Sequence, residues 1–204
     1  MAAWPNVGKV LGVDPSPGFI AKARELAAGT PNLSFEVGDG RSLESKDATF
    51  DVVVFHTVLG QMAEPEKGLA EAHRVLKSGG WLAVFDNDSI TTSVSIGEHD
   101  PLQACIDARI AAAVNDKWLV RRLLGVLKET GFAPRPLRTH SLVETLEVDW
   151  MLTMVDRGAE ALLAIGRIGS ELAAALKAEA RRRIRAGQFF GHNVYVSVVA
   201  QKLA

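Results

Sequence analysis

The segment that most restricts the fold is a nearly unbroken apolar run, F-D-V-V-V-F-H, at residues 50–56. Strands that are covered on both faces have continuous apolar sequences, whereas strands with one face in water alternate apolar and polar residues. The run therefore predicts a strand at the centre of a sheet, with other structure packed on both of its faces.

Two weaker strand segments precede this run and flank a predicted helix. Residues 9–14 (K-V-L-G-V-D) predict a short buried strand that stops at Pro15, and residues 33–39 predict a second strand with one more polar face. Between them, Ser16 is a suitable N-cap. Pro17 suits the first helical position, because the N–H that it lacks would be unpaired there in any case.

The same alternation continues after the central run. Pro65 opens a predicted helix, S-G-G at residues 78–80 ends it, and residues 81–86 (W-L-A-V-F-D) predict the next strand. Alternating strands and helices are typical of an α/β fold with a mostly parallel sheet, which is the fold class we expect.

Two further helices are predicted in the middle of the chain. One covers residues 101–113, and the other, around residues 118–127, is capped by Asn115 or Asp116 and ended by Gly131.

The last third contains a long helical segment between two strands. Residues 134–140 weakly predict a strand, and residues 194–199 (V-Y-V-S-V-V) predict a final one. The region between them, residues 143–186, is rich in Ala and Leu and too long for a hairpin loop, so we expect a helical cap over the sheet.

Charge and cysteine content exclude several kinds of protein. The 204 residues include 23 Lys and Arg against 24 Asp and Glu, so the net charge of -1 gives no general attraction to nucleic acid or anionic membranes. The single cysteine, Cys105, permits neither an internal disulfide nor a thiolate zinc site, and we expect no metal and a reducing, cytoplasmic setting. No apolar run reaches the roughly 18 residues of a membrane span, and residues 1–9 lack the pattern of a signal peptide.

Four segments, in this order, resemble the class I S-adenosylmethionine-dependent methyltransferases, particularly those that act on small molecules. They are G-V-D-P-S (12–16), E-V-G-D-G (36–40), F-D-V-V-V-F-H-T-V-L (50–59) and R-V-L-K-S-G-G-W-L-A-V-F-D (74–86). Their order and spacing match the second to fifth strands of that fold. The resemblance implies one Rossmann-like domain over residues 1–204, with a sheet core at 9–141 and 194–202 and a helical cap at 143–190.

The resemblance also implies which residues bind the cofactor, S-adenosylmethionine. Asp14, followed by Pro15, would accept hydrogen bonds from the ribose hydroxyls. Asp39, between Gly38 and Gly40, would accept from the adenine amino group while the glycines let the backbone approach the base. The alternative is that both aspartates only begin turns.

His56 ends the central run at the edge where open α/β sheets bind their ligands. It either lines the cofactor cleft or is an ordinary hydrogen-bonded histidine at a strand end. Phe19 either contacts adenine or packs in the core, and we favour the core.

Substrate contacts are predicted only weakly. His99 with Asp100, and His192 in the F-F-G-H turn, are candidates for binding the methyl acceptor, with a surface loop position as the alternative. Four basic residues of a long helix would bind an acidic substrate or form a solvated face, and we favour the solvated face. These residues are Arg181, Arg182, Arg183 and Arg185.

One departure from the family pattern concerns the start of the chain. Complete members begin with a strand, a glycine-rich loop and a helix, which residues 1–8 are too few to form. In the family's sheet that first strand lies between the second and fourth strands. The chain is therefore a fragment or late start of a longer protein, or those two strands pair directly, or another chain fills the gap. We favour the first as the origin, and we expect direct pairing in a structure of this chain, with weak or absent cofactor binding.

Two functions from different classes follow from these patterns. The first is methyl transfer to an unidentified small molecule selected by the cap, for which positioning suffices and no catalytic residue is predicted. The alternative is a non-catalytic remnant that serves as a partner or scaffold subunit. A nicotinamide dehydrogenase is a more distant third, because no glycine fingerprint follows a strand. Nucleic acid is disfavoured as a substrate by the balanced charge.

Overall fold

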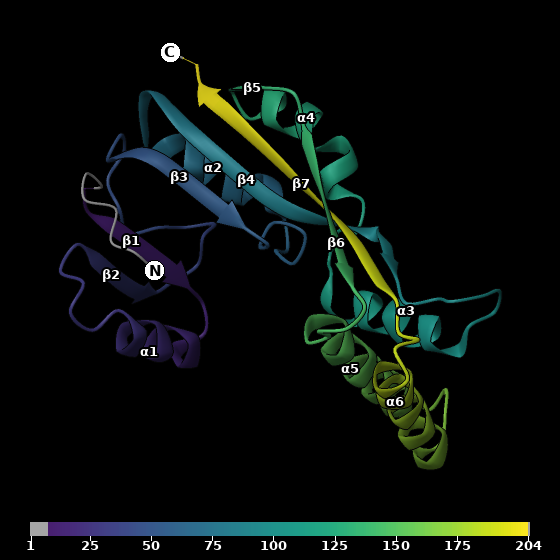
Figure 1. The fold of residues 1–204 in the computed structure, drawn as a ribbon. Coiled ribbons are helices and arrows are strands. Elements are labelled where there is room, and N and C mark those ends of the chain that lie inside the picture. The colour runs from purple at the N-terminus through teal and green to yellow at the C-terminus, as the bar shows by residue number, and fades with distance from the viewer. Residues whose placement is uncertain (1–7, 204) are drawn as a thin grey trace.

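The computed structural model describes residues 8–203, which form seven strands and six helices (Figure 1). Residues 1–7, where the sequence predicts no leader, and residue 204 lie outside the described residues. The strands are β1 (Val10–Asp14), β2 (Leu33–Val37), β3 (Phe50–His56), β4 (Leu76–Ser93), β5 (Phe132–Pro134), β6 (Arg138–Glu144) and β7 (Gly191–Lys202). The helices are α1 (Pro17–Leu26), α2 (Pro65–Val75), α3 (Pro101–Ala113), α4 (Leu119–Glu129), α5 (Trp150–Ala164) and α6 (Ser170–Arg185).

The first unit is a parallel strand pair joined by a helix. β1 and β2 pair from Val10 opposite Leu33 to Asp14 opposite Val37, and α1 connects them. The helix begins as predicted: Ser16 Oγ accepts a hydrogen bond from the Phe19 backbone N–H at 3.3 Å, and proline occupies the first turn.

The second sheet has five strands in the order β3-β4-β7-β5, with β6 also paired to β7. β3 and β4 run parallel, whereas β7 runs antiparallel to β4, β5 and β6. The predicted α/β, Rossmann-like fold class is confirmed. In the first half of the chain, β1 runs parallel to β2 and β3 runs parallel to β4. β4 is much longer than the predicted segment at residues 81–86.

Helices cover only one face of this sheet. α2 and α4 pack against the side of the sheet that carries Phe55, Leu82 and Val198, and the core lies between them. Figure 1 shows both helices behind the strands in this view. On the opposite face, Val52 is 53% exposed and Val54 is 61% exposed. The prediction that residues 50–56 are covered on both faces at the centre of a sheet is therefore wrong for the described residues, where β3 is an edge strand.

The expected direct pairing of the second and fourth family strands is also wrong. Among residues 8–203, β1 pairs only with β2, and β3 pairs only with β4, so the two strand groups form separate sheets. The strands β1, β2 and β3 nevertheless point toward the same end of the molecule, as their arrowheads show in Figure 1.

Polar contacts with α2 hold the connection between the two sheets in place. The Leu43 backbone N–H donates to Glu71 Oε1 at 2.6 Å. Arg74 Nη2 donates to the carbonyl oxygens of Leu43 and Ser45 at 3.1 and 2.8 Å. These charge-assisted bonds to backbone groups fix the loop after β2 against the second sheet.

The helices α3, α5 and α6 form a separate bundle around their own apolar cluster, and α5 and α6 lie in the segment for which the sequence predicts a helical cap. α3 and α5 cross at very close range, because Gly158 lies directly against the Cys105 carbonyl group. The Cys105 thiol is buried there, and burial raises its pKa to about 11, so this thiol is an inert packing group.

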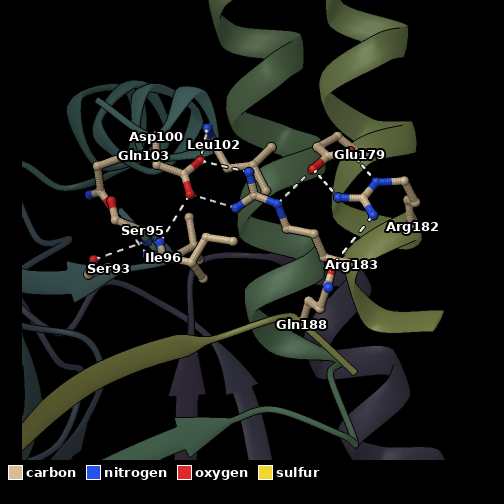
Figure 2. Close-up of polar contacts among 11 residues, drawn as sticks. Ser93, Ser95, Ile96, Asp100, Leu102, Gln103, Glu179, Arg182, Arg183 and Gln188 are labelled. Carbon is tan, nitrogen blue, oxygen red and sulfur yellow. Dashed lines mark hydrogen bonds and ion pairs between the residues drawn. The ribbon is translucent and has the colours of Figure 1, made fainter. Parts of the chain in front are cut away.

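One of the four arginines predicted to form a solvated face is instead buried in this bundle. Arg183 donates to both carboxylate oxygens of Asp100, at 2.6 and 3.1 Å, and to Glu179 at 2.8 Å (Figure 2). The interaction joins α6 to the loop before α3. The prediction is wrong for Arg183 because a local basic run does not show which member meets a distant carboxylate.

Candidate functional site

The two acidic residues singled out in the sequence lie at the same edge of the first sheet. Asp14 is the last residue of β1, and Asp39 follows β2 by two positions. The Gly38 backbone N–H donates to the Asp14 carbonyl oxygen at 3.1 Å, which extends the parallel pairing to this point. Both carboxylates therefore stand at the carboxyl ends of neighbouring parallel strands, where open α/β sheets bind ligands.

Asp14 retains hydrogen-bonding capacity at this edge. Its Oδ1 accepts from the Ser16 backbone N–H at 2.7 Å, which forms the turn into α1 through the exposed Pro15. Within residues 8–203 no cation pairs with this carboxylate. Because a carboxylate offers about four lone-pair sites, Oδ2 is left to accept from a ligand.

Asp39 forms a hydrogen-bonded ion pair with Arg41. The Arg41 Nη2 donates to Asp39 Oδ2 at 2.6 Å, and the Arg41 backbone N–H donates to Oδ1 at 2.9 Å. These side-chain and backbone hydrogen bonds lower the pKa of Asp39 to about 2. The carboxylate is therefore ionised at neutral pH, and it stays partly exposed and open to another donor.

The glycines beside Asp39 allow close packing of the loop. A Cβ at Gly38 would lie 3.0 Å from Val13 Cγ1, and one at Gly40 would lie 3.3 Å from Met62 Cε. Both positions are tight enough that a larger residue would displace a neighbour.

The sequence analysis favoured a core position for Phe19, and this prediction is wrong. Its side chain is 71% exposed, because no element of the described chain lies over this side of α1. It lines a shallow hollow of about 210 Å³ together with Gly12, Asp14 and Phe35.

His56 ends β3 and is exposed on the uncovered face of the second sheet. Its ring stacks on Phe85 of β4, with ring centroids 4.9 Å apart. The next residue, Thr57, has a φ of 54°, and the chain turns there into the loop before α2.

A buried acid that the sequence analysis did not single out holds this loop. Asp86 Oδ2 accepts from the Gly60 backbone N–H at 3.1 Å, and Oδ1 accepts from the Asn87 N–H at 2.9 Å. Burial raises the pKa of Asp86, and the backbone hydrogen bonds oppose that rise. Asp86 thereby ties the loop after β3 to the middle of the neighbouring strand β4.

The two histidines predicted to contact substrate lie elsewhere. His99 is an exposed residue with a φ of 55°, next to the N-cap of α3. Its neighbour Asp100 caps α3 by accepting from the Leu102 N–H at 3.0 Å. His192 lies near the start of β7, with its Nε2 3.1 Å from Ser141 Oγ and its ring stacked on Phe190. Neither histidine joins the residues at the ends of β1 and β2.

The structure brings together aromatic residues that the sequence analysis missed. Phe85 stacks on Tyr195 of β7 with centroids 5.0 Å apart, and Tyr195 meets Trp150 at the start of α5 at 6.3 Å. His140 of β6 lies 5.8 Å from Phe85. The alternation in V-Y-V-S-V-V was a usable signal, because it places Tyr195 and Ser197 on one face of the strand.

A second cavity lies at the junction of β4 with the helical bundle. Its volume is about 360 Å³, and its lining includes Ser89, Thr92, Asp107, Ile110 and Lys117. Across the described part of the chain, no three His, Cys, Asp or Glu side chains converge in a way that would hold a metal ion. None of the helices found in residues 8–203 has both the length and the apolar content needed to cross a bilayer.

Comparison with known proteins gives relatives of several kinds. An uncharacterised 37.1 kDa transposon protein of Streptomyces fradiae is 27% identical over 95% of this chain and 55% of its own length. An arsenite methyltransferase of Halobacterium salinarum is 31% identical over 61% of this chain and 31% of its own length. The chain thus spans about half or less of the length of these relatives.

Solved structures share the fold. A methyltransferase-like protein from Bacillus halodurans superimposes with a TM-score of 0.66 over 98% of this chain and 85% of that one, at 20% sequence identity.

The structure is a Rossmann-like α/β fold with two carboxylates at the carboxyl ends of neighbouring parallel strands, which is the edge where such sheets generally bind ligands. The family model described as "Methyltransferase domain" matches residues 1–84. This match covers less than half of the chain, and together with the related sequences it shows that the first part of the chain is similar to methyltransferases.

Proposed function

We propose that this chain transfers the methyl group of S-adenosylmethionine to a small-molecule acceptor. The observation that carries the proposal is the placement of two carboxylates at the ends of neighbouring parallel strands, with tightly packed glycines beside one of them. The family match supports the cofactor, and relatives such as the arsenite methyltransferase support a small acceptor.

The residues at this edge fit the nucleoside part of the cofactor. Asp14 would accept from the ribose hydroxyls through its free oxygen, and Pro15 would fix the turn beside it. Asp39, held ionised by Arg41, would accept from the adenine amino group between Gly38 and Gly40. These two acceptors match the hydroxyl and amino donors of a nucleoside.

When bound, S-adenosylmethionine supplies a methyl group bonded to a sulfonium sulfur. The methyl carbon therefore already carries a good leaving group. The chain's own task is therefore to align the acceptor and exclude water, and no covalent catalyst is needed. His56 is suited to line the cofactor side of the acceptor site, because it ends β3 at the same end of the molecule as Asp14. His99 and His192 remain candidate acceptor contacts from the cap side.

Titration calorimetry with S-adenosylmethionine tests the proposal. We expect binding that is weaker than low micromolar, because the cofactor contacts found in the described residues gather at the nucleoside end. Asp14→Asn removes the charge, and a charge-assisted hydrogen bond contributes roughly 1.5 to 3 kcal/mol, so binding falls about 10- to 150-fold.

Asp51→Asn is the matched control. Asp51 lies near the start of β3, at the opposite end from this edge, where it pairs with Lys77 at 2.7 Å. Its substitution leaves the affinity unchanged. Equal affinities for all three proteins would contradict the assigned cofactor site.

A further inference from the structure

Three aromatic rings form a continuous row across the uncovered face of the second sheet. His56, Phe85 and Tyr195 come from β3, β4 and β7, and successive ring centroids lie 4.9 and 5.0 Å apart. His56 and Phe85 are directly opposite each other in the register, whereas Tyr195 is the diagonal neighbour of Phe85. The interplanar angles are only 24° and 13°. The rings are therefore stacked, with their faces turned toward one another.

This arrangement decides what the row presents outward. The faces of Phe85 are occupied by its neighbours, so its outer surface is a ring edge. Aromatic edges carry partial positive charge and aromatic faces partial negative charge, so an edge favours the face of another aromatic ring. None of the three rings is fully buried, and His56 is exposed. The row is therefore a surface that fits a flat π-system lying across it.

A polar group stands at one end of the row. Burial raises the pKa of Tyr195, and the adjacent Asn193 side chain offsets part of that rise. Asn193 is completely buried, and its Nδ2 forms no well-aligned hydrogen bond within residues 8–203. The Tyr195 hydroxyl is a donor as well as an acceptor, so it can hydrogen-bond a polar group of a ligand.

The row runs from the end of β3 to the helix α5. His56, at one end, closes β3 next to the loop tied down by Asp86. Tyr195, at the other end, meets Trp150 at the first turn of the cap helix α5. A molecule lying on the row would thus extend from the carboxyl end of β3 to the first turn of α5.

We propose that the row of His56, Phe85 and Tyr195 binds a planar aromatic or heteroaromatic methyl acceptor, with the Tyr195 hydroxyl donating a hydrogen bond to a polar substituent of that ring. This inference rests on the proposed function, since it names the acceptor class of the same site.

The test uses the fact that the chain contains a single tyrosine. Labelling with 3-fluorotyrosine gives one fluorine NMR signal, which reports on the row alone. We expect 4-nitrophenol to shift this signal in a saturable manner in the absence of cofactor. Cyclohexanol, which has a hydroxyl group but no π-face, should leave it unshifted. Equal effects of the two compounds would overturn the assignment of an aromatic acceptor.

Two substitutions then separate the hydroxyl from the ring, with the affinity for 4-nitrophenol measured by calorimetry. Tyr195→Phe removes only the hydrogen bond and should weaken binding about 3- to 10-fold. Tyr195→Leu also removes the ring and should weaken it further. Asp107→Asn is the control: Asp107 lines the 360 Å³ cavity, and its substitution should leave the affinity for 4-nitrophenol unchanged. Loss of binding in Asp107→Asn but not in Tyr195→Phe would place the probe in that cavity and overturn the proposal.

Binding of S-adenosylmethionine, measured on the same proteins, separates this inference from the function on which it rests. Tyr195→Phe should bind the cofactor as the unmodified chain does. Cofactor binding without any 4-nitrophenol binding would overturn the acceptor assignment and leave methyl transfer standing. Loss of both would overturn both.

Discussion

Arg183 and Asp100 form a two-pronged ion pair in which side-chain exposures are only 8% and 3% (Figure 2). Asp100 also accepts from the backbone N–H groups of Ile96 and Leu102 at 3.0 Å each. The same carboxylate therefore caps α3, fixes the loop that precedes it and anchors α6. This pair determines how the helical cap is seated, because it crosses between segments 83 positions apart.

Removing the arginine should destabilise the cap strongly. Arg183→Met leaves Asp100 buried without its counter-charge, and breaking one side of a buried ion pair costs roughly 3 to 5 kcal/mol. Arg185→Met, two positions further along α6 and exposed, should stay within about 0.5 kcal/mol. Urea unfolding of the two variants measures the difference. Equal midpoints would show that the ion pair contributes little.

The same cluster predicts a loss of cap stability in acid. Hydrogen bonds from Arg182 and Arg183 lower the pKa of Glu179 to about 2. For Asp100, burial favours a higher pKa, but the bonds from Arg183, Ile96 and Leu102 prevail and lower it. A carboxyl group with a lowered pKa stabilises the fold fully above its ordinary value, and this contribution is lost as the pH falls through the folded-state value. Stability should therefore fall between about pH 4 and pH 2.

The measurement is the urea midpoint as a function of pH, for the unmodified chain and for Arg183→Met. Because the variant lacks the guanidinium that lowers both pKa values, its stability should depend less on pH in this range. Parallel curves would contradict the role assigned to Asp100 and Glu179.

Local signals in the sequence predicted the secondary structure well. The strand at residues 50–56 and the helix at residues 101–113 have the predicted bounds, because proline, capping residues and continuous apolar runs act within a few positions. Ser16 caps α1 and Gly131, with a φ of 87°, follows the C-cap of α4, as expected from the same local rules.

The errors concern relationships between distant segments. Phe19 is exposed and β3 is an edge strand, because burial depends on which elements lie alongside, and no local pattern encodes that. Arg182 and Arg183 both donate to Glu179, but only Arg183 also pairs with Asp100 and is buried. The aromatic row was missed for the same reason, since His56, Phe85 and Tyr195 lie on three strands brought together by the sheet register. For the candidate site, the sequence analysis found the edge acids and His56, but not the aromatic neighbours of His56.

The interaction between Asp39 and Arg41 gives a prediction for the candidate cofactor edge. Arg41→Met removes the side-chain hydrogen bonds and the neighbouring charge, so the pKa of Asp39 should rise from about 2 toward its ordinary value of 3.8. Carbon-13 NMR of the aspartate side-chain carboxyl carbons follows this titration directly. Lys67→Met is the control, because Lys67 pairs with Glu64 at 2.7 Å and does not contact Asp39. An unchanged Asp39 titration in Arg41→Met would contradict the contact.

Two glycines in helices should respond in opposite directions to the same substitution. A Cβ at Gly158 of α5 would lie 1.8 Å from the Cys105 carbonyl oxygen, which is backbone and cannot rotate away. Gly158→Ala must therefore separate α3 from α5, and overpacking of this kind costs roughly 1 to 3 kcal/mol or more. Gly125 of α4 has no heavy atom within 4 Å of the added carbon, so Gly125→Ala should stabilise the chain by about 0.5 to 1 kcal/mol through higher helix propensity. Urea unfolding of both variants gives the two signs, and a neutral Gly158→Ala would mean that the helices cross less closely than this geometry requires.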